Sequence, residues 1–75
     1  MQRYKDINND SNVSRFEIGN DFIIIEFKSG SFRTYTYTYI SAGSEHVEKM
    51  KRLALNHNGL NSYIRRNNPK YSSKS

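Results

Sequence analysis

This 75-residue chain contains no cysteine, no tryptophan and only one proline. Without cysteine, neither a disulfide framework nor a thiolate metal site can stabilise the fold. Stability must therefore come from the packing of a small core, and a chain of this length buries roughly 60% of its unfolded surface. There is room for one domain, and a second domain is excluded.

Long hydrophobic runs are also absent. The longest uninterrupted apolar run covers residues 22–25, whereas about 20 apolar residues are needed to span a bilayer. Residues 1–6 lack the apolar region of a secretion signal. The expectation is a soluble, cytoplasmic protein with no membrane partner.

Acidic residues are missing from the last third of the chain. Residues 1–48 hold all seven acidic residues and five basic ones, whereas residues 49–75 hold seven basic residues and no acidic one. Clustered lysine and arginine raise the local potential and favour phosphate through the release of counterions. This asymmetry predicts a surface for an acidic partner, and the alternative is a basic tail that only keeps a small protein soluble.

Threonine and tyrosine alternate over residues 34–39. A period of two places Tyr35, Tyr37 and Tyr39 on one face of a strand. Such a face can either form one side of a small core or present rings on which the bases of a nucleic acid stack.

Two further strands are predicted before this one, over residues 13–18 and 22–28, because both segments alternate and are rich in β-branched and aromatic residues. Residues 19–21 supply a turn between them. Ser29-Gly30 fits a two-residue hairpin turn to the third strand. The three strands then form an antiparallel meander.

The predicted hairpin turn fixes which residues face each other across the second and third strands. Ile25 faces Thr34, and Glu26 faces Arg33 as an ion pair. Arg33 and the tyrosines then share the more accessible face, opposite the face that carries Ile25. A slip of one residue would exchange the two faces completely, so this assignment depends on the turn.

Helical patterns follow the strands. A helix is predicted from Ser44, as its N-cap, to about Asn58, and a shorter helical segment over residues 60–67 ends before Pro69. One arc of the longer helix is suited to packing on a sheet; it holds His46, Val47, Met50, Leu53, Ala54 and His57.

The predicted fold is an α+β domain, in which a three-stranded antiparallel meander is covered on one face by a helix and carries a short C-terminal helical segment. Residues 13–68 form the domain. Residues 1–12 are expected to be a flexible arm, and residues 69–75 a flexible basic tail.

Basic residues divide into two groups by their spacing from acids. Lys49 and Arg52 each lie four residues after a glutamate, so ordinary ion pairs on the helix surface explain them. Four others have no acid at that spacing and are candidates for phosphate contacts: Lys51, Arg65, Arg66 and Lys70. Arg65 and Arg66 are the first choice, because arginine forms forked hydrogen bonds with phosphate.

Nothing in the sequence predicts catalysis, a metal site or a cofactor. His46 and His57 would lie about 16 Å apart along one helix, which is too far to share a metal ion. A locally organised nucleophile set, paired carboxylates beside a strand end and a glycine-rich phosphate loop are all missing. The chain is therefore not expected to be an enzyme or to bind a small-molecule cofactor.

Several segments together carry a family resemblance: residues 27–30 (Phe-Lys-Ser-Gly), the tyrosine run, residues 41–43 (Ser-Ala-Gly), residues 50–54 (Met-Lys-Arg-Leu-Ala) and residues 59–65. Through them the chain resembles the KTSC domain, which occurs at the C-terminus of some lysyl-tRNA synthetases and as short stand-alone proteins. The Tyr-x-Tyr hallmark of that family is matched by residues 35–37 and, overlapping them, by residues 37–39. The family has no established function, and its synthetase context implies RNA.

The sequence thus favours a small, non-catalytic accessory domain that binds RNA through a basic patch and a tyrosine-rich strand. The predicted contact residues are Arg33, Tyr35, Tyr37, Tyr39, Lys51, Arg65, Arg66 and Lys70. The alternative is a protein-interaction or self-association module, in which the tyrosine face or the exposed edge of the third strand docks another protein.

Overall fold

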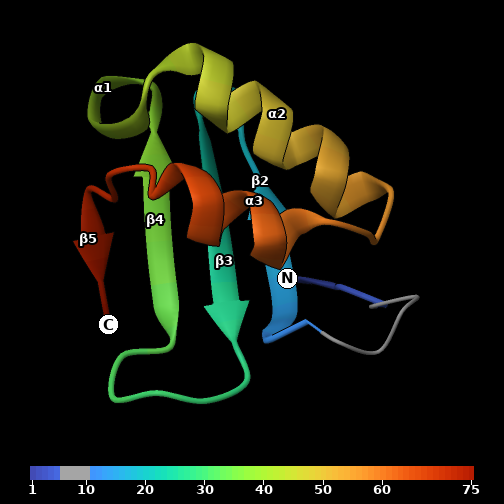
Figure 1. Cartoon of the computed structure of the whole chain (residues 1–75). Helices are drawn as coiled ribbons and strands as arrows, with labels where there is room; N and C mark the ends of the chain where they lie inside the picture. Colours follow the sequence, from blue (N-terminus) through green and yellow to red (C-terminus); the bar gives the residue numbers. More distant parts are fainter. Residues whose placement is uncertain (6–10) are drawn as a thin grey trace.

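The computed structural model describes residues 1–5 and 11–75, and it has an α+β fold built on one antiparallel sheet (Figure 1). The strands follow the chain in the order β1-β2-β3-β4-β5. They are β1 (Gln2–Arg3), β2 (Val13–Ile18), β3 (Phe22–Phe27), β4 (Thr34–Thr38) and β5 (Ser73–Lys74). The helices are α1 (Tyr39–Ala42), α2 (Ser44–Leu55) and α3 (Leu60–Asn67).

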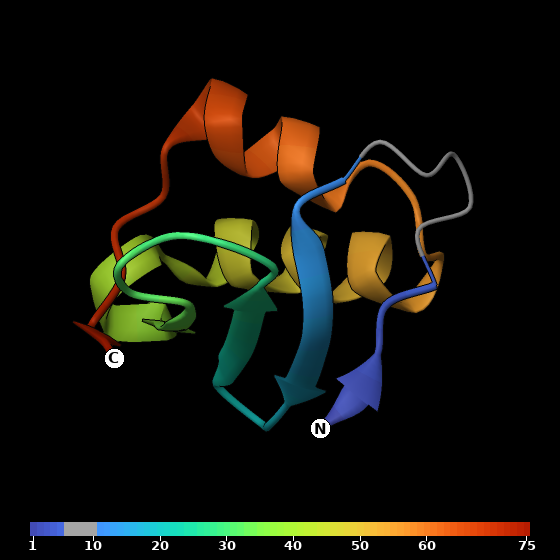
Figure 2. The ribbon, with the colours of Figure 1, turned by 90° about the horizontal axis from the view of Figure 1, so that it is seen from below.

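The core lies between the sheet and the two longer helices, which pack on the same face of the sheet (Figure 2). Its buried side chains come from the strands, from the residue that follows β1, from α2 and from the first turn of α3. They are Tyr4, Val13, Phe16, Ile23, Ile25, Tyr37, Val47, Met50, Ala54 and Leu60. The buried positions of α2 are three and four residues apart, which confirms the arc that the sequence predicts for this helix.

The register between β3 and β4 differs by one residue from the predicted register. Ile25 lies opposite Tyr35, not Thr34, and Glu26 lies opposite Thr34, not Arg33. The two-residue turn at Ser29-Gly30 is wrong, because a six-residue connection, residues 28–33, joins the strands. The Phe27 amide closes this loop by donating to the Arg33 carbonyl oxygen at 2.6 Å.

This shift exchanges the two faces of β4 relative to those of β3. Tyr35 and Tyr37 lie on the covered face with Ile23 and Ile25, while the threonines of β4 lie on the face that no helix covers within the described residues. Two aromatic rings add far more buried area to a small core than two threonines could. The prediction that the tyrosine face is the accessible one is therefore wrong.

A cap at the end of β4 removes Tyr39 from the strand. The Ser41 amide donates to the Thr38 hydroxyl oxygen, and the Thr38 amide donates to the Ser41 hydroxyl oxygen, both at 3.0 Å. This reciprocal capping starts α1 at Tyr39. Gly43, with a φ of 92°, then joins α1 to α2 and takes the N-cap position predicted for Ser44.

The two longer helices lie close to their predicted positions. α2 ends at Leu55, three residues before the predicted end, and α3 spans the predicted segment from Leu60 to Asn67. Gly59 separates them with a φ of 82°, a left-handed conformation that glycine adopts without steric cost. The sequence therefore predicts both helices and the break between them.

Both ends of the chain add an edge strand, so the sheet has five strands among the described residues instead of the predicted three. Gln2–Arg3 pairs with β2, and Tyr4, the residue after β1, is buried. The prediction that residues 1–12 form a flexible arm is therefore wrong for these residues. Residues 6–10 of that arm lie outside the described residues. At the opposite edge, Ser73–Lys74 of the predicted tail pairs with β4 (Figure 1). These segments satisfy backbone groups that a three-stranded sheet would expose.

Candidate nucleic-acid interface

The three tyrosines of the alternating run occupy three different environments. Tyr37 is only 3% exposed and belongs to the core. Burial raises the pKa of its hydroxyl to about 12, and the nearby hydroxyls of Tyr35 and Tyr71 add to this effect. The ring of Tyr35 lies 6.4 Å from that of Tyr37, nearly parallel to it, and is half-buried. Tyr37 therefore cannot serve as a platform for a base.

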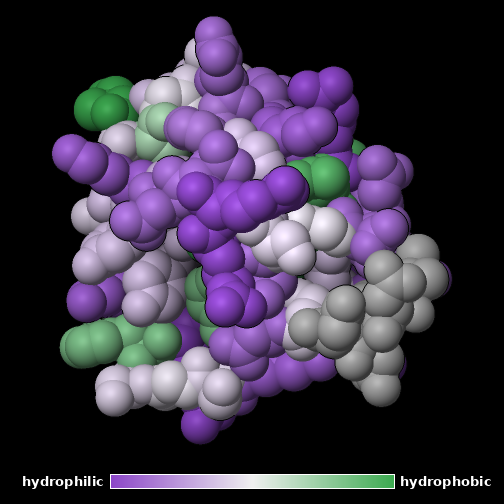
Figure 3. Space-filling model, viewed as in Figure 1, coloured by the Kyte–Doolittle hydropathy of each residue, from purple (hydrophilic) through white to green (hydrophobic). Residues whose placement is uncertain are grey.

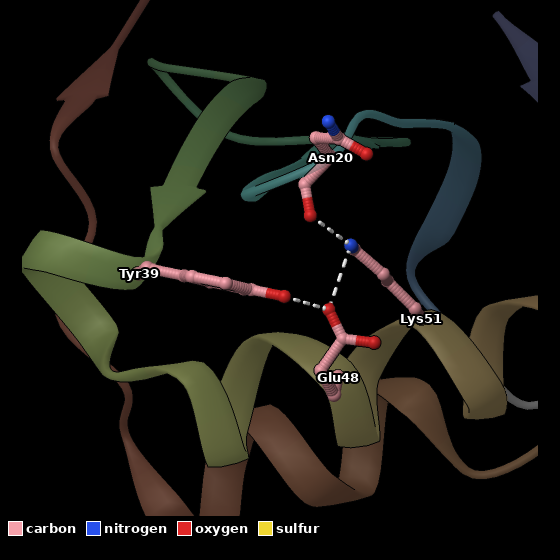
Figure 4. A network of polar contacts seen from close by, with 4 residues as sticks. All are labelled: Asn20, Tyr39, Glu48 and Lys51. Atoms are coloured by element: carbon pink, nitrogen blue, oxygen red, sulfur yellow. Dashed lines mark hydrogen bonds and ion pairs between the residues drawn. The ribbon is translucent and has the colours of Figure 1, made fainter.

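Tyr39 of α1 and Lys51 of α2 belong to a polar network that also includes Glu48 and the turn between β2 and β3 (Figure 4). The Tyr39 hydroxyl donates to Glu48 Oε2, and Lys51 Nζ lies 2.7 Å from the same oxygen. Lys51 Nζ also donates to the carbonyl oxygen of Asn20 at 2.8 Å, which ties α2 to the turn between β2 and β3. The hydrogen bond from Lys51 and that from Tyr39 lower the pKa of Glu48, and the bond to Glu48 raises that of Tyr39.

This network removes Lys51 from the predicted phosphate site. The sequence-based prediction rests on acids four residues away, whereas Glu48 lies three residues from Lys51, a spacing that is also within reach on a helix. The side chain of Lys51 is only 12% exposed. Tyr39 is likewise committed to Glu48 and does not share a face with Tyr35.

Arg33 is exposed at the end of the connection between β3 and β4. Its predicted partner, Glu26, instead faces Arg15 across β2 and β3. Two charge-assisted hydrogen bonds join that pair, from Arg15 Nε at 2.8 Å and from Arg15 Nη2 at 2.7 Å. The hydrogen bonds from Arg15 lower the pKa of Glu26. The predicted ion pair is therefore wrong, and the guanidinium of Arg33 stays at the surface.

Arg65 and Arg66 lie side by side in the last turn of α3 and are exposed. Together with Ser62 they line an open surface hollow of about 630 Å³. Within the described residues, neither arginine makes an ion pair or a side-chain hydrogen bond. Figure 3 shows strongly hydrophilic side chains over the centre of this face, where α3 runs in Figure 1.

A pocket of about 450 Å³ opens beside α3, between the connection 28–33 and the segment after α3. We call it the aromatic pocket. It is lined by five rings, which belong to Phe27, Phe32, Tyr35, Tyr37 and Tyr71, and by Asn12, Ser29, Gly30, Ser31, Ile64, Asn68 and Pro69. Ile64 connects it to α3, because this residue immediately precedes the two exposed arginines.

Two lysines lie next to the aromatic pocket. Lys70 lines a smaller hollow together with Asn68, Pro69 and Tyr71, all of which also line the aromatic pocket. Lys74 Nζ lies 4.7 Å from the ring centroid of Phe32 and 5.3 Å from that of Tyr71, in cation–π contact with both. The sequence predicts Lys70 but not Lys74, Phe32 or Tyr71.

The structure therefore brings together only part of the predicted site. Arg65, Arg66, Lys70 and Tyr35 lie on α3 and around the aromatic pocket. Tyr37 is buried behind them. Tyr39 and Lys51 are bound to Glu48, and Arg33 lies at the end of the loop that forms one wall of the pocket.

The two histidines make contacts with different parts of the protein. His57 Nδ1 accepts a hydrogen bond from the Lys5 amide at 3.0 Å, and its ring packs against Tyr4 and Phe16. His46 contacts the hydroxyl of Tyr63. Within residues 1–5 and 11–75, no three histidine, aspartate or glutamate side chains gather where they could hold a metal ion. In the same part of the chain, no helix has the length and apolar character needed to cross a membrane.

Comparisons with known proteins return no match. No family model matches the chain, and no curated protein and no solved structure is significantly similar to it.

Proposed function

We propose that this chain is a small, non-catalytic domain that binds single-stranded RNA, with Arg65 and Arg66 of α3 as its principal phosphate contacts. The observation that supports this proposal most directly is that these neighbouring guanidiniums are exposed and, within the described residues, unpaired. Arginine that lacks a carboxylate partner keeps its full set of forked donors for phosphate. Lys70 extends the basic surface beyond the end of α3.

The charge distribution supports an acidic partner over an apolar one. No acidic residue follows Glu48 in the sequence, so every charged side chain of α3 and of the segment after it is positive. Lysine and arginine side chains that neutralise phosphates release the cations condensed on the nucleic acid, so the free energy of binding depends strongly on salt. The resemblance to the KTSC domain, with its synthetase context, supports RNA as the acidic partner.

The test is a titration of mixed-sequence single-stranded RNA at two salt concentrations. We expect binding at low salt and a steep loss of affinity as salt rises. Arg65→Glu combined with Arg66→Glu should abolish detectable binding. Arg65→Ala with Arg66→Ala, which removes two phosphate contacts, should lower the slope of log affinity against log salt by about 1.4.

A matched control carries the same change of charge elsewhere on the molecule. Arg3→Glu combined with Lys49→Glu alters two exposed residues on β1 and α2. It should weaken binding far less than the change on α3, because only the long-range field is altered. Equal losses in both double variants, or no binding of the unmodified chain at low salt, would contradict the proposal.

One observation favours a second candidate, a protein-interaction or self-association module. The face of the sheet that carries no helix among the described residues presents Phe22 and Ile24, both partly exposed, beside the threonines of β4. An apolar contact there should persist or strengthen as salt rises. Concentration-dependent sedimentation that is lost in Ile24→Lys would support this candidate, and strictly monomeric behaviour would exclude self-association.

A further inference from the structure

We infer that the aromatic pocket takes up one unstacked base of the RNA strand whose phosphates Arg65 and Arg66 hold. This inference rests on the proposed function. It adds the requirement that the bound RNA strand has an unpaired, unstacked base. It also assigns a binding role to Phe32, Tyr71 and Lys74, which do not belong to the site predicted from the sequence.

The size and walls of the pocket fit a flat ring. A volume of about 450 Å³ lies within the range of about 300–1,000 Å³ that is usual for ligand sites. Tyr35 is held from two sides, since Phe27 and Tyr71 meet its ring at 85° with centroids 5.4 and 5.0 Å away. Tyr35 therefore forms a fixed part of the wall rather than a mobile platform.

Two rings of the pocket leave much of their surface open. Phe32 is 48% exposed and Tyr71 is 42% exposed, and they come from segments almost forty residues apart in the sequence. Large rings that remain exposed in so small a protein suit stacking, because every nucleic-acid base offers a flat face whatever its identity. A base could therefore enter beside Phe32 and Tyr71 without reorganising the core.

The positive charges beside the pocket favour an aromatic ligand that also carries a negative group. None of the twelve lining residues that the structure describes is acidic or basic, while Lys74 lies against Phe32 and Tyr71 and Lys70 lies in the adjoining hollow. Two ammonium groups beside an uncharged aromatic pocket disfavour a cationic ligand and favour a nucleotide, with its base inside and its phosphate at the lysines.

Polar groups inside the pocket can read the edge of a base. Asn68 lines it in a left-handed conformation, with a φ of 46°, and its side-chain amide makes no hydrogen bond within the described residues. An asparagine amide offers both a donor and an acceptor, which match the edges of bases. Asn12 also lines the pocket, but its Oδ1 accepts a hydrogen bond from Ser29 Oγ at 3.2 Å.

The pocket and the two arginines can serve one strand. Residues 64–71 run from the pocket wall at Ile64, through Arg65 and Arg66, and back to the pocket at Tyr71. A base paired in a duplex is stacked between its neighbours and cannot enter. The chain should therefore prefer single-stranded RNA to a duplex, as is usual for proteins that stack bases on aromatic side chains.

The experiment uses a short single-stranded RNA that contains the fluorescent base 2-aminopurine, and the same RNA annealed to its complement. For the unmodified chain we expect the fluorescence to change on binding and the duplex to bind more weakly. Phe32→Ser or Tyr71→Ser should lower the affinity for the single strand about 5- to 150-fold and reduce the preference over the duplex. Neither residue belongs to the buried core, so the fold should persist, which circular dichroism checks.

Two control variants separate stacking from general effects. Tyr71→Phe keeps the ring and should retain most of the affinity. Ile40→Ser removes an apolar side chain that is 98% exposed on α1 and does not line the pocket, and it should leave the affinity unchanged. An equal loss in Ile40→Ser and Phe32→Ser would overturn the inference.

The remaining outcomes distinguish the inference from the proposed function. If the arginine variants lose RNA binding while Phe32→Ser and Tyr71→Ser bind normally, the pocket inference is overturned and the proposed function stands. If RNA does not bind at low salt, adenosine monophosphate is titrated while the signals of Phe32 and Tyr71 are followed by NMR. Shifts there would retain the pocket as a nucleotide site and reject the RNA function, and no shifts would reject both.

Discussion

Three tyrosines that alternate in sequence perform three different tasks in this fold. Tyr37 completes the core, Tyr35 forms a wall of the aromatic pocket, and Tyr39 donates a hydrogen bond to Glu48. The residue type is the same in each case. The difference arises from the register of β4 and from the cap that Thr38 provides, and both are set by residues outside the tyrosines themselves.

Burial of Tyr37 predicts a loss of stability at alkaline pH. Its hydroxyl pKa is about 12 in the folded state against 10 in the ordinary case. Below pH 10 both states keep the proton, and between 10 and about 12 the unfolded chain ionises first, so the free energy of unfolding should fall as pH rises. Urea unfolding across this window should show a shallower fall for Tyr37→Phe. Identical slopes for the two proteins would contradict the burial.

The residues of the candidate site were predictable only where the local sequence decides their role. The sequence predicts that Arg65 and Arg66 are unpaired because no acid lies near them on their helix, and within the described residues neither makes an ion pair. Lys51 was misassigned, because its partner Glu48 lies three residues away and not four. Tyr71 and Lys74 could not be found, because their place beside Phe32 exists only once the end of the chain pairs with β4.

At the scale of elements, hydrophobic periodicity was sufficient to locate β2, β3, β4, α2 and α3. It could not fix how β3 and β4 align, because both faces of that hairpin carry plausible core residues. The decisive feature is the connection 28–33, which is longer than the two-residue turn suggested by Ser29-Gly30. A pattern of period two is compatible with either face, and the loop length decides between them.

The register can be tested with one charge placed on each face of β4. Thr36→Asp places the carboxylate on the uncovered face and should change the free energy of unfolding by no more than about 1 kcal/mol. Tyr37→Asp removes a buried ring and buries a carboxylate, so it should cost more than about 3 kcal/mol. Chemical denaturation of both variants measures the difference. The opposite ranking would indicate the two-residue turn and the exchanged faces.

At the scale of the whole molecule, the two chain ends complete the sheet at its opposite edges. Near the C-terminus, the Ser72 amide donates to the Thr36 carbonyl oxygen at 2.7 Å, and the Ser75 amide donates to the Thr34 carbonyl oxygen at 2.8 Å. This pairing covers the edge of β4 and also carries Lys74 to the aromatic pocket. Stability of the sheet and assembly of the candidate site are therefore linked.

Deletion of residues 72–75 should affect both the stability and the association of the protein. We expect a loss of about 2–4 kcal/mol, since several backbone hydrogen bonds with net values near 1 kcal/mol disappear. The freed edge of β4 should also promote association at high concentration. Thermal unfolding and sedimentation measure the two effects, with Lys74→Ala as the control that keeps the backbone pairing. A truncated chain as stable and as monomeric as the control would contradict the role of β5.

The most direct test of the proposed interface is NMR mapping of the isotope-labelled chain with a short single-stranded RNA at low salt. The largest shifts should fall on the second half of α3, on residues 68–74 and on the loop around Phe32. The threonines of β4, on the opposite face of the sheet, should change little. Shifts confined to those threonines, or no shifts at any RNA concentration, would contradict an interface built from α3 and the aromatic pocket.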